Sequence, residues 1–206
     1  MNNNFLSKTY QYVMFSILLS SLGAYIGLQN STIFMSTGVF IGLIILELVT
    51  LLAFFFLYNK NGINTILYYL FSFLTGLTLV PLLMKAISIN PDLILISLLL
   101  TAVAVGSFSY YAINTKRDFS GMGKYLFVTL VVLIVATITN IFLQLPILHI
   151  VISAVTVILF SFFLIYDTQS IIRGDYPTPM MAAINLYIDI LNMFSGILSL
   201  LIHNDD

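Results

Sequence analysis

The stretch TIFMSTGVFIGLIILELVTLLAFFFLY at residues 32–58 contains a single charged residue, Glu47. It exceeds the roughly 20 apolar residues that a helix needs to cross a bilayer, and its apolar residues do not alternate as in the strands of a membrane barrel. The rest of the chain is similar: of its 206 residues, 60% are hydrophobic and 7% are charged. Soluble domains carry about a quarter charged residues. The sequence therefore predicts an all-α integral membrane protein.

Seven apolar segments of this kind follow one another, parted by short separators rich in Asn, Gly, Pro and charged residues. Short connections make consecutive helices antiparallel neighbours in a bundle. No polar stretch is long enough for a soluble domain, so we expect one transmembrane domain over residues 1–206. The expected helices span about 10–28, 32–58, 63–85, 92–113, 124–144, 147–172 and 180–201.

The cations are unevenly divided between the two ends of the predicted helices. Lys and Arg in short loops stay on the cytoplasmic side of a membrane. The N-terminus and the second, fourth and sixth loops carry six cations, whereas the opposite side carries only Lys85. The six are Lys8, Lys60, Lys116, Arg117, Lys124 and Arg173. We therefore expect a cytoplasmic N-terminus and, with seven spans, a C-terminus outside.

Composition also excludes several functions. Seven Lys and Arg against eight Asp and Glu leave no basic patch for nucleic acid, and the absence of cysteine removes thiolate metal sites and cysteine nucleophiles. The two histidines, His149 and His203, lie at the end of the bundle opposite to the deep acids, which argues against a Ser/His/Asp triad. An aspartyl protease is disfavoured because the second aspartate, Asp189, lacks a preceding glycine motif. We expect neither an enzyme nor a bound cofactor.

Three carboxylates fall inside predicted spans: Glu47, Asp167 and Asp189. Burial of an ionisable group in a bilayer costs about 2.5 to 3.5 kcal/mol on insertion scales, so such a group usually has a function. Glu47 and Asp189 lie roughly 14 to 17 Å, and Asp167 roughly 8 Å, from the cytoplasmic ends of their helices at 1.5 Å per residue. No Lys or Arg lies deep enough to pair with them. Carboxylates without a cation share protons, bind a cation or face water.

Polar residues accompany these acids on single helix faces. Asn185, Asp189 and Asn192 follow helical spacing together with Gly196 and Ser199, so this stripe should face the interior of the bundle. Structural alternatives remain for each acid. Glu47 could be a protonated acid bonded to a backbone carbonyl, Asp167 could meet Arg173, and the Asn and Ser side chains could simply join helices.

Two motifs lie near the end of the sequence, IYDTQ at 165–169 and LYIDILNMF at 186–194, and three lie upstream, ILEL at 45–48, TGLTLVP at 75–81 and NIF at 140–142. With these motifs the chain resembles the Bax inhibitor (transmembrane Bax-inhibitor-motif) family. Each motif is degenerate alone, but their order, spacing and seven-helix context make the assignment specific. The resemblance implies a bundle of six helices around a central seventh, which acts in bacterial members as a pH-sensitive calcium leak.

The resemblance also implies roles for individual residues. The aspartates matching Asp167 and Asp189 form a hydrogen-bonded pH sensor, and the acid matching Glu47 lies in the pore. The related calcium-leak protein latches its first sensor aspartate with an arginine at the end of helix two, where this chain has Tyr58. Lys60 is a candidate substitute, but lysine is a point charge without the bidentate fork of arginine.

These observations lead to one hypothesis and two rivals. We expect a calcium leak gated by protons on Asp167 and Asp189, with Glu47, Asn185 and Asn192 contacting the ion. Calcium would bind the three acids only transiently, because tight calcium sites use six to eight oxygens. The rivals are a proton-coupled secondary transporter and a non-catalytic membrane adaptor. We expect a bacterial plasma membrane location, with calcium ions, protons and the bilayer as partners.

Overall fold

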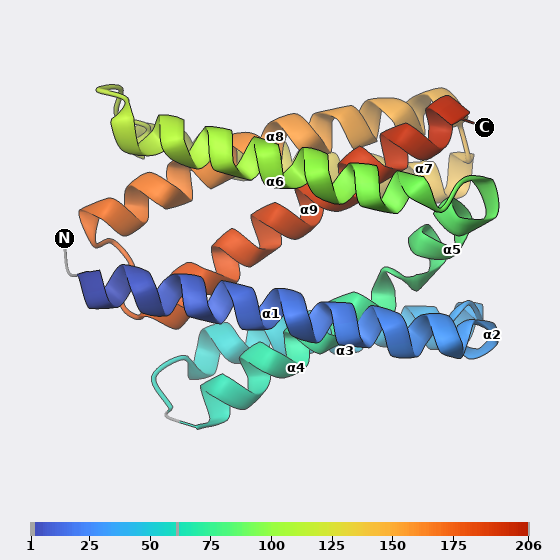
Figure 1. Cartoon of the computed structure of the whole chain (residues 1–206), viewed down its shortest axis with the longest axis horizontal. Helices are drawn as coiled ribbons and strands as arrows, with labels where there is room; N and C mark the ends of the chain where they lie inside the picture. Colours follow the sequence, from blue (N-terminus) through green and yellow to red (C-terminus); the bar gives the residue numbers. More distant parts are fainter. Residues whose placement is uncertain (1–2, 61, 206) are drawn as a thin grey trace. The chain divides into compact units, whose positions relative to one another are not determined.

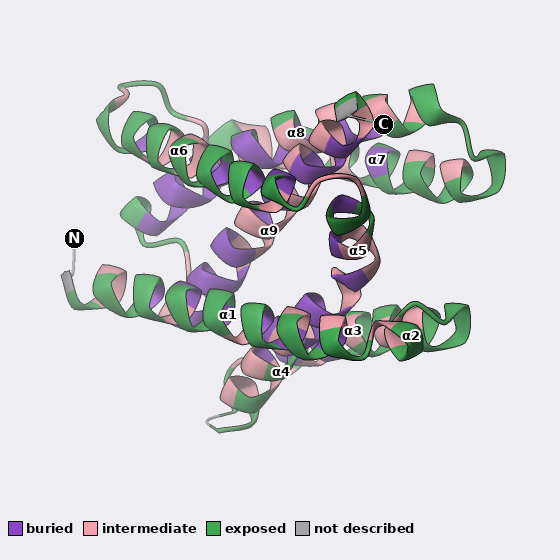
Figure 2. Ribbon diagram, turned by 45° about the vertical axis from the view of Figure 1, so that its right-hand side comes forward, coloured by how far each residue is buried: buried purple, intermediate pink, exposed green. Residues whose placement is uncertain are grey.

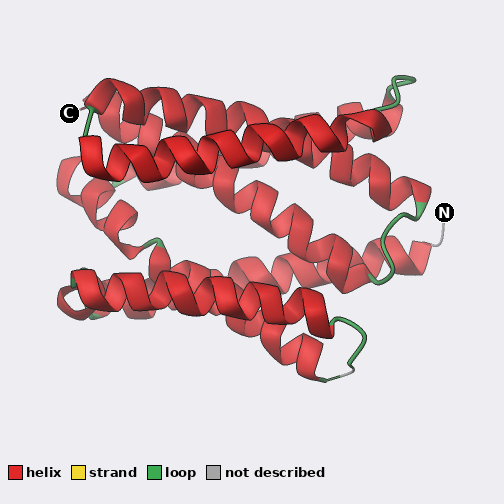
Figure 3. Cartoon of the chain, turned by 180° about the vertical axis from the view of Figure 1, so that it is seen from behind, coloured by secondary structure: helices red, strands yellow, loops and turns green. Residues whose placement is uncertain are grey.

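The regular structure is entirely helical over residues 3–60 and 62–205, the part of the chain that the computed structural model describes (Figure 3). Seven helical segments in this part are long and apolar enough to cross a membrane. The predicted all-α membrane protein with seven spans is therefore confirmed. The helices are α1 (Asn3–Gln29), α2 (Ser31–Phe34), α3 (Thr37–Leu57), α4 (Ile63–Thr78), α5 (Val80–Ile89), α6 (Asp92–Asn114), α7 (Gly123–Leu143), α8 (Pro146–Arg173) and α9 (Pro179–Asp205), with a 3₁₀ turn η1 (Ser120–Met122) before α7.

The third span differs from the single helix expected at 63–85. It consists of α4 and α5, which meet between Thr78 and Val80. Pro81 has no N–H to donate to the carbonyl of Leu77, and its ring crowds that carbonyl, so an α-helix breaks there. The first span also begins earlier than expected, at Asn3, because polar residues before the apolar run continue the helix. Both ends of the chain, Met1 and Asp206, lie outside the described residues, and the predicted orientation stays a prediction.

Contacts between residues divide the chain into two compact units. We call residues 3–85 with 178–187 the N-terminal unit, and residues 86–177 with 188–205 the C-terminal unit. The helix α9 thus gives its first two and a half turns to one unit and its remainder to the other. A single transmembrane domain over 1–206 stays a prediction.

In the N-terminal unit, α4 packs against both α1 and α3 (Figure 1). The backbones of α1 and α4 approach closely at two glycines: a Cβ atom on Gly76 would overlap the Ser20 carbonyl, and one on Gly23 would overlap the Phe73 carbonyl. The hydrophobic effect does not drive helices together inside a lipid bilayer, so membrane helices associate through close packing, which small residues permit. Tyr68 of α4 is fully buried there, with its ring 5.9 Å from that of Phe54 in α3.

In the C-terminal unit, α8 packs against α6 and α7 and also contacts α9. Buried positions concentrate on α8 and α9, whereas α6 and α7 are largely exposed (Figure 2). Far from the aspartates, the Ser153 hydroxyl donates to Ser199 at 3.0 Å, and Ser199 lies 2.8 Å from Nε2 of His149. Gly196 faces the same turn of α8. Two residues of the polar stripe predicted for the last helix, Gly196 and Ser199, therefore meet α8 in this unit.

Candidate functional site

Asp167 of α8 and Asp189 of α9 form a buried pair in the C-terminal unit. Only 5% of Asp167 and 3% of Asp189 are exposed, and their carboxyl groups are hydrogen-bonding partners. Two ionised carboxylates are both acceptors, so this bond requires a proton on one of them. Oδ2 of Asp189 is buried and receives no hydrogen bond from any protein donor in the described chain. The two carboxyls are therefore buried together, with one oxygen that no protein donor satisfies in the described chain.

The other oxygen contact of Asp167 is a tyrosine that sequence reasoning missed. Tyr176 donates its hydroxyl to Oδ1 of Asp167 at 2.7 Å. Gly174 ends α8 in the left-handed conformation, with φ of 81°, and Asp175 N–H donates to the Ser170 carbonyl. This turn, common at helix ends, sends the chain back over the last turn of α8. Burial, reinforced by the nearby Asp167 carboxyl, raises the pKa of Tyr176, so its hydroxyl stays a donor at physiological pH.

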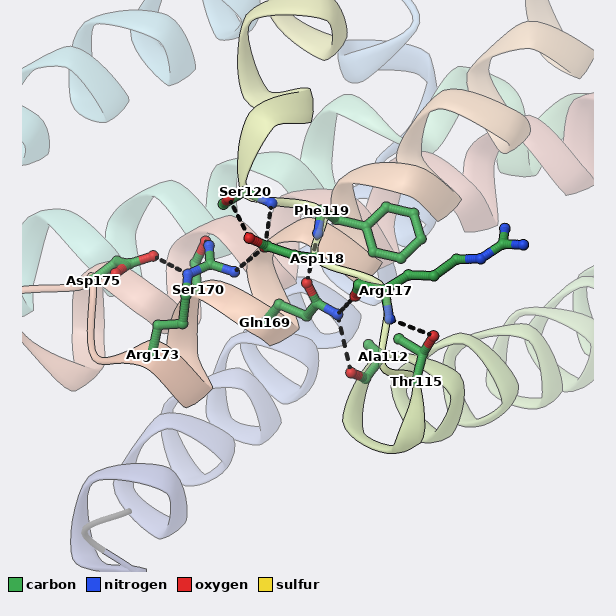
Figure 4. Close-up of polar contacts among 10 residues, drawn as sticks. All are labelled: Ala112, Thr115, Arg117, Asp118, Phe119, Ser120, Gln169, Ser170, Arg173 and Asp175. Carbon is green, nitrogen blue, oxygen red and sulfur yellow. Dashed lines mark hydrogen bonds and ion pairs between the residues drawn. The ribbon is translucent and has the colours of Figure 1, made fainter.

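Arg173 does not meet Asp167, which was one alternative from the sequence. Its guanidinium donates to Asp175 at 2.9 Å and to the Ser170 hydroxyl at 2.8 Å, and lies 3.7 Å from Asp118 (Figure 4). Six residues separate Arg173 from Asp167, so the two side chains leave α8 on different faces. Over the described ranges 3–60 and 62–205, neither aspartate of the pair takes part in an ion pair.

Gln169, two residues after Asp167, fastens the α6–α7 loop to α8. Its amide nitrogen donates to the Arg117 carbonyl at 2.9 Å and the Ala112 carbonyl at 3.4 Å, and its oxygen accepts from the Phe119 N–H at 3.0 Å (Figure 4). One side chain thus binds a carbonyl in the last turn of α6 and two backbone groups of the following loop. The predicted motif at 165–169 therefore combines a buried carboxyl with an amide that holds a loop.

Glu47 lies in the N-terminal unit, half-buried on α3. Its Oε2 accepts a hydrogen bond from the Thr78 hydroxyl at 2.8 Å. Thr78 is the last residue of α4, so the acid faces the break in the third span. Irregular backbone at membrane depth is tolerated where it is buried in protein or lines a water-filled cavity. One turn earlier, the hydroxyl of Thr75 is hydrogen-bonded to that of Tyr187 in the first part of α9.

The remaining predicted site residues make local contacts. The amides of Asn185 and Asn192, both half-buried, donate to the carbonyls four residues earlier in α9, at 2.8 Å each. Tyr58 follows α3, where its carbonyl accepts from the side chain of Asn64 at 2.8 Å, and Lys60 is exposed in the next loop. The ion-contact role of the two asparagines and the latch role of Tyr58 or Lys60 stay predictions.

Several known proteins are similar to this chain. The family model described as inhibitor of apoptosis-promoting Bax1 matches residues 2–206. An uncharacterized protein of Campylobacter jejuni is 40% identical over 201 residues, covering 96% of this chain and 87% of that protein. An uncharacterized membrane protein of Vibrio cholerae is 31% identical over 211 residues, covering 99% and 92%. The modulator of FtsH protease from Escherichia coli is 36% identical over 110 residues, covering 53% and 50%. With a family match along nearly its whole length and such relatives, the chain belongs to the Bax inhibitor family.

Proposed function

We propose that the protein is a pH-sensitive calcium leak in which protons on Asp167 and Asp189 control the flow of cations. The observation that carries this proposal is the buried carboxyl pair, which lies in membrane-spanning helices without a cationic partner among the described residues. Two carboxyls in a medium of low dielectric do not both ionise easily, so the charge of the pair depends on pH. A purely structural contact would be cheaper to build from neutral side chains.

The change in charge would act on α9. Asp189 lies two residues after Tyr187, which is hydrogen-bonded to Thr75 of α4 in the N-terminal unit. Ionisation of both aspartates creates repulsion and a demand for water, which favours movement of α9 relative to α8. Because α9 is one continuous helix, such a movement would reach the Thr75 contact and the nearby end of α4. In this mechanism α9 is therefore the helix that would switch between two positions as the charge of the aspartate pair changes.

Glu47 would attract the cation. A half-buried carboxylate beside the broken third span offers one charged ligand, and the break leaves backbone carbonyls near it. One carboxylate with carbonyls and water binds calcium weakly, since tight sites need more oxygens. Weak binding permits both entry and exit of the ion, as conduction requires.

The experiment that tests this proposal is calcium entry into liposomes that contain the purified protein. Glu47→Gln keeps the hydrogen bond to Thr78 but removes the charge, so we expect calcium flux to fall about tenfold, from the loss of one favourable charge in the ion path. The matched control is Asp92→Asn, at an exposed carboxyl at the start of α6. Equal flux in Glu47→Gln and wild type would remove Glu47 from the ion path.

A second prediction concerns Tyr176. Its hydroxyl stabilises the ionised form of Asp167, and a hydrogen bond to a charged group contributes about 1.5 to 3 kcal/mol. In Tyr176→Phe the aspartate pair should take up its proton at higher pH, because the hydrogen bond that stabilises the ionised carboxylate is lost. We expect the midpoint of the pH dependence of flux to rise by about one pH unit. A midpoint unchanged in Tyr176→Phe would show that this hydroxyl does not tune the pair.

The name of the Escherichia coli relative supports a second candidate, the modulation of a protease. In that role the aspartates would be structural, and replacement of both by asparagine should leave partner binding intact. A proton-coupled transporter is distinguished in another way, because it would move its solute uphill when a proton gradient is imposed. A leak only dissipates gradients.

The proposed setting is a bacterial plasma membrane with the N-terminus in the cytoplasm and the C-terminus outside. The named relatives are bacterial, and the distribution of Lys and Arg supports this orientation. Cysteine accessibility from each side of the membrane would test it, with single cysteines introduced in the naturally cysteine-free chain at Lys8 and Asn204.

A further inference from the structure

Two cavities adjoin at the α6–α7 loop of the C-terminal unit, and they differ sharply in character. The first, of about 230 Å³, is lined by polar and charged groups that include Lys116, Arg117, Gln169 and Arg173. The second, of about 450 Å³, is almost wholly apolar. Its walls come from α6, the loop and α8, namely Phe108, Tyr111, Phe119, Phe162 and Ile165, with Arg117 shared between the two cavities.

The lining of the polar cavity carries a net positive charge. Three cations line it against one carboxylate, Asp118. The backbone N–H and the hydroxyl of Ser120 hold the pKa of Asp118 below its usual range, so this carboxylate stays ionised, and it lies beside Arg173. The side chains of Lys116 and Arg117 have no hydrogen-bond or ion-pair partner within the described ranges 3–60 and 62–205. In Figure 4 the Arg117 side chain runs away from Gln169 and ends clear of the other residues drawn.

The loop that carries these cations is fixed in place. Gln169 binds the backbone at Arg117 and Phe119, so the position of the cavity mouth is set by α8. The apolar cavity begins at this mouth and follows α6 back to Ser107, seven residues before the end of that helix, which is roughly 10 Å at 1.5 Å per residue. A group that fills both cavities must therefore be anionic at one end and apolar for about that distance.

We propose that this composite cavity binds one anionic phospholipid, with its phosphate at Lys116 and Arg117 and an acyl chain along Phe108, Phe162 and Ile165. Charge complementarity selects an anionic headgroup, and basic pockets between membrane helices are known to hold such lipids. The apolar wall selects a lipid over a free anion, since inorganic phosphate would leave the larger cavity unfilled. Arg117, with its long apolar stem and charged tip, suits the boundary between the two.

Native mass spectrometry of the detergent-purified full chain tests this proposal. The probes are phosphatidylglycerol and phosphatidylcholine with identical acyl chains, added separately. Wild type should retain phosphatidylglycerol at least about fivefold more than phosphatidylcholine, and Arg117→Gln or Lys116→Gln should reduce this preference by about fivefold each. Lys124→Gln is the matched control, because Lys124 is an exposed cation in the first turn of α7 that lines neither cavity.

A second variant probes the apolar half. Ser107→Phe places a bulky ring in the wall of the second cavity while leaving Lys116 and Arg117 intact, and it should lower retention of both lipids. Circular dichroism and gel filtration identical to wild type establish that each variant folds. Equal retention of the two lipids by wild type, or an unchanged preference in Arg117→Gln, would overturn the proposal. Displacement of phosphatidylglycerol by inorganic phosphate alone, with Ser107→Phe behaving as wild type, would assign the site to a small anion instead.

Discussion

Gly76→Leu is expected to abolish the packing of α1 against α4 and to leave little folded protein. A Cβ atom at position 76 would overlap the Ser20 carbonyl oxygen and approach the backbone N of Ala24 at 2.8 Å. The atoms in the way belong to the backbone of α1, so no side chain can rotate to make room. Overpacking costs about 1 to 3 kcal/mol even where side chains can adjust, and more where they cannot. We expect a loss of at least about 3 kcal/mol, measured as a collapse of the monodisperse peak in gel filtration and of the thermal transition in detergent.

Gly42→Leu provides the matched control for this prediction. Gly42 lies on α3 in the same N-terminal unit, and a Cβ atom there would meet nothing within 4 Å. It is exposed between apolar side chains such as Ile41 and Ile45, so a leucine should be accepted without loss of folded protein. If Gly76→Leu melted like Gly42→Leu, the close approach of α1 and α4 described above would be wrong.

Asp167→Asn and Asp189→Asn are each expected to remove the pH dependence of calcium flux. Either change leaves one carboxyl beside an amide. The amide can donate a hydrogen bond but cannot ionise, so the repulsion between two ionised carboxylates is lost. Flux that changes by about tenfold per pH unit across a titration in wild type should vary by less than about twofold in the variants over the same range. The absolute flux of each variant should resemble one limit of the wild-type curve.

The control for these variants is an acid that lies outside the pair. Asp92→Asn removes an exposed carboxylate at the start of α6 and should retain the wild-type pH curve. A full wild-type pH response in both Asp167→Asn and Asp189→Asn would eliminate the carboxyl pair as the sensor. The same variants bear on the adaptor alternative, in which there is no flux for them to alter.

Much of the architecture could be predicted from the sequence because the spans are continuously apolar. The pairing of Asp167 with Asp189 was implied by the resemblance to the Bax inhibitor family. The residues alone indicated only that both aspartates lie on polar helix faces with no cation within reach. The pairing lies within one unit, where α8 and α9 pack along the stripe that also contains Gly196. Helical spacing identifies such faces because residues three or four positions apart point in the same direction from the helix.

Contacts that depend on turns could not be predicted in this way. Tyr176 reaches Asp167 only because Gly174 adopts a positive φ and reverses the chain, and helical spacing says nothing about residues beyond a helix end. In the sequence Gln169 stands out only as part of the motif at 165–169, although its side chain forms hydrogen bonds with three backbone groups. Gly174 and Pro177 indicated a turn, but they did not indicate that this turn would bring the side chain of Tyr176 into contact with α8.

The most direct test of the account measures protonation and flux on the same proteoliposomes. Infrared absorption of protonated carboxyl groups, recorded together with calcium entry from about pH 6 to 8, follows the aspartate pair and the leak at once. If the aspartate pair gates the leak, the carboxyl band and the flux titrate with one midpoint, and the band loses this titration in Asp167→Asn. Flux that titrates while the carboxyl band stays constant, or the absence of any protein-dependent calcium flux from folded protein, would contradict it.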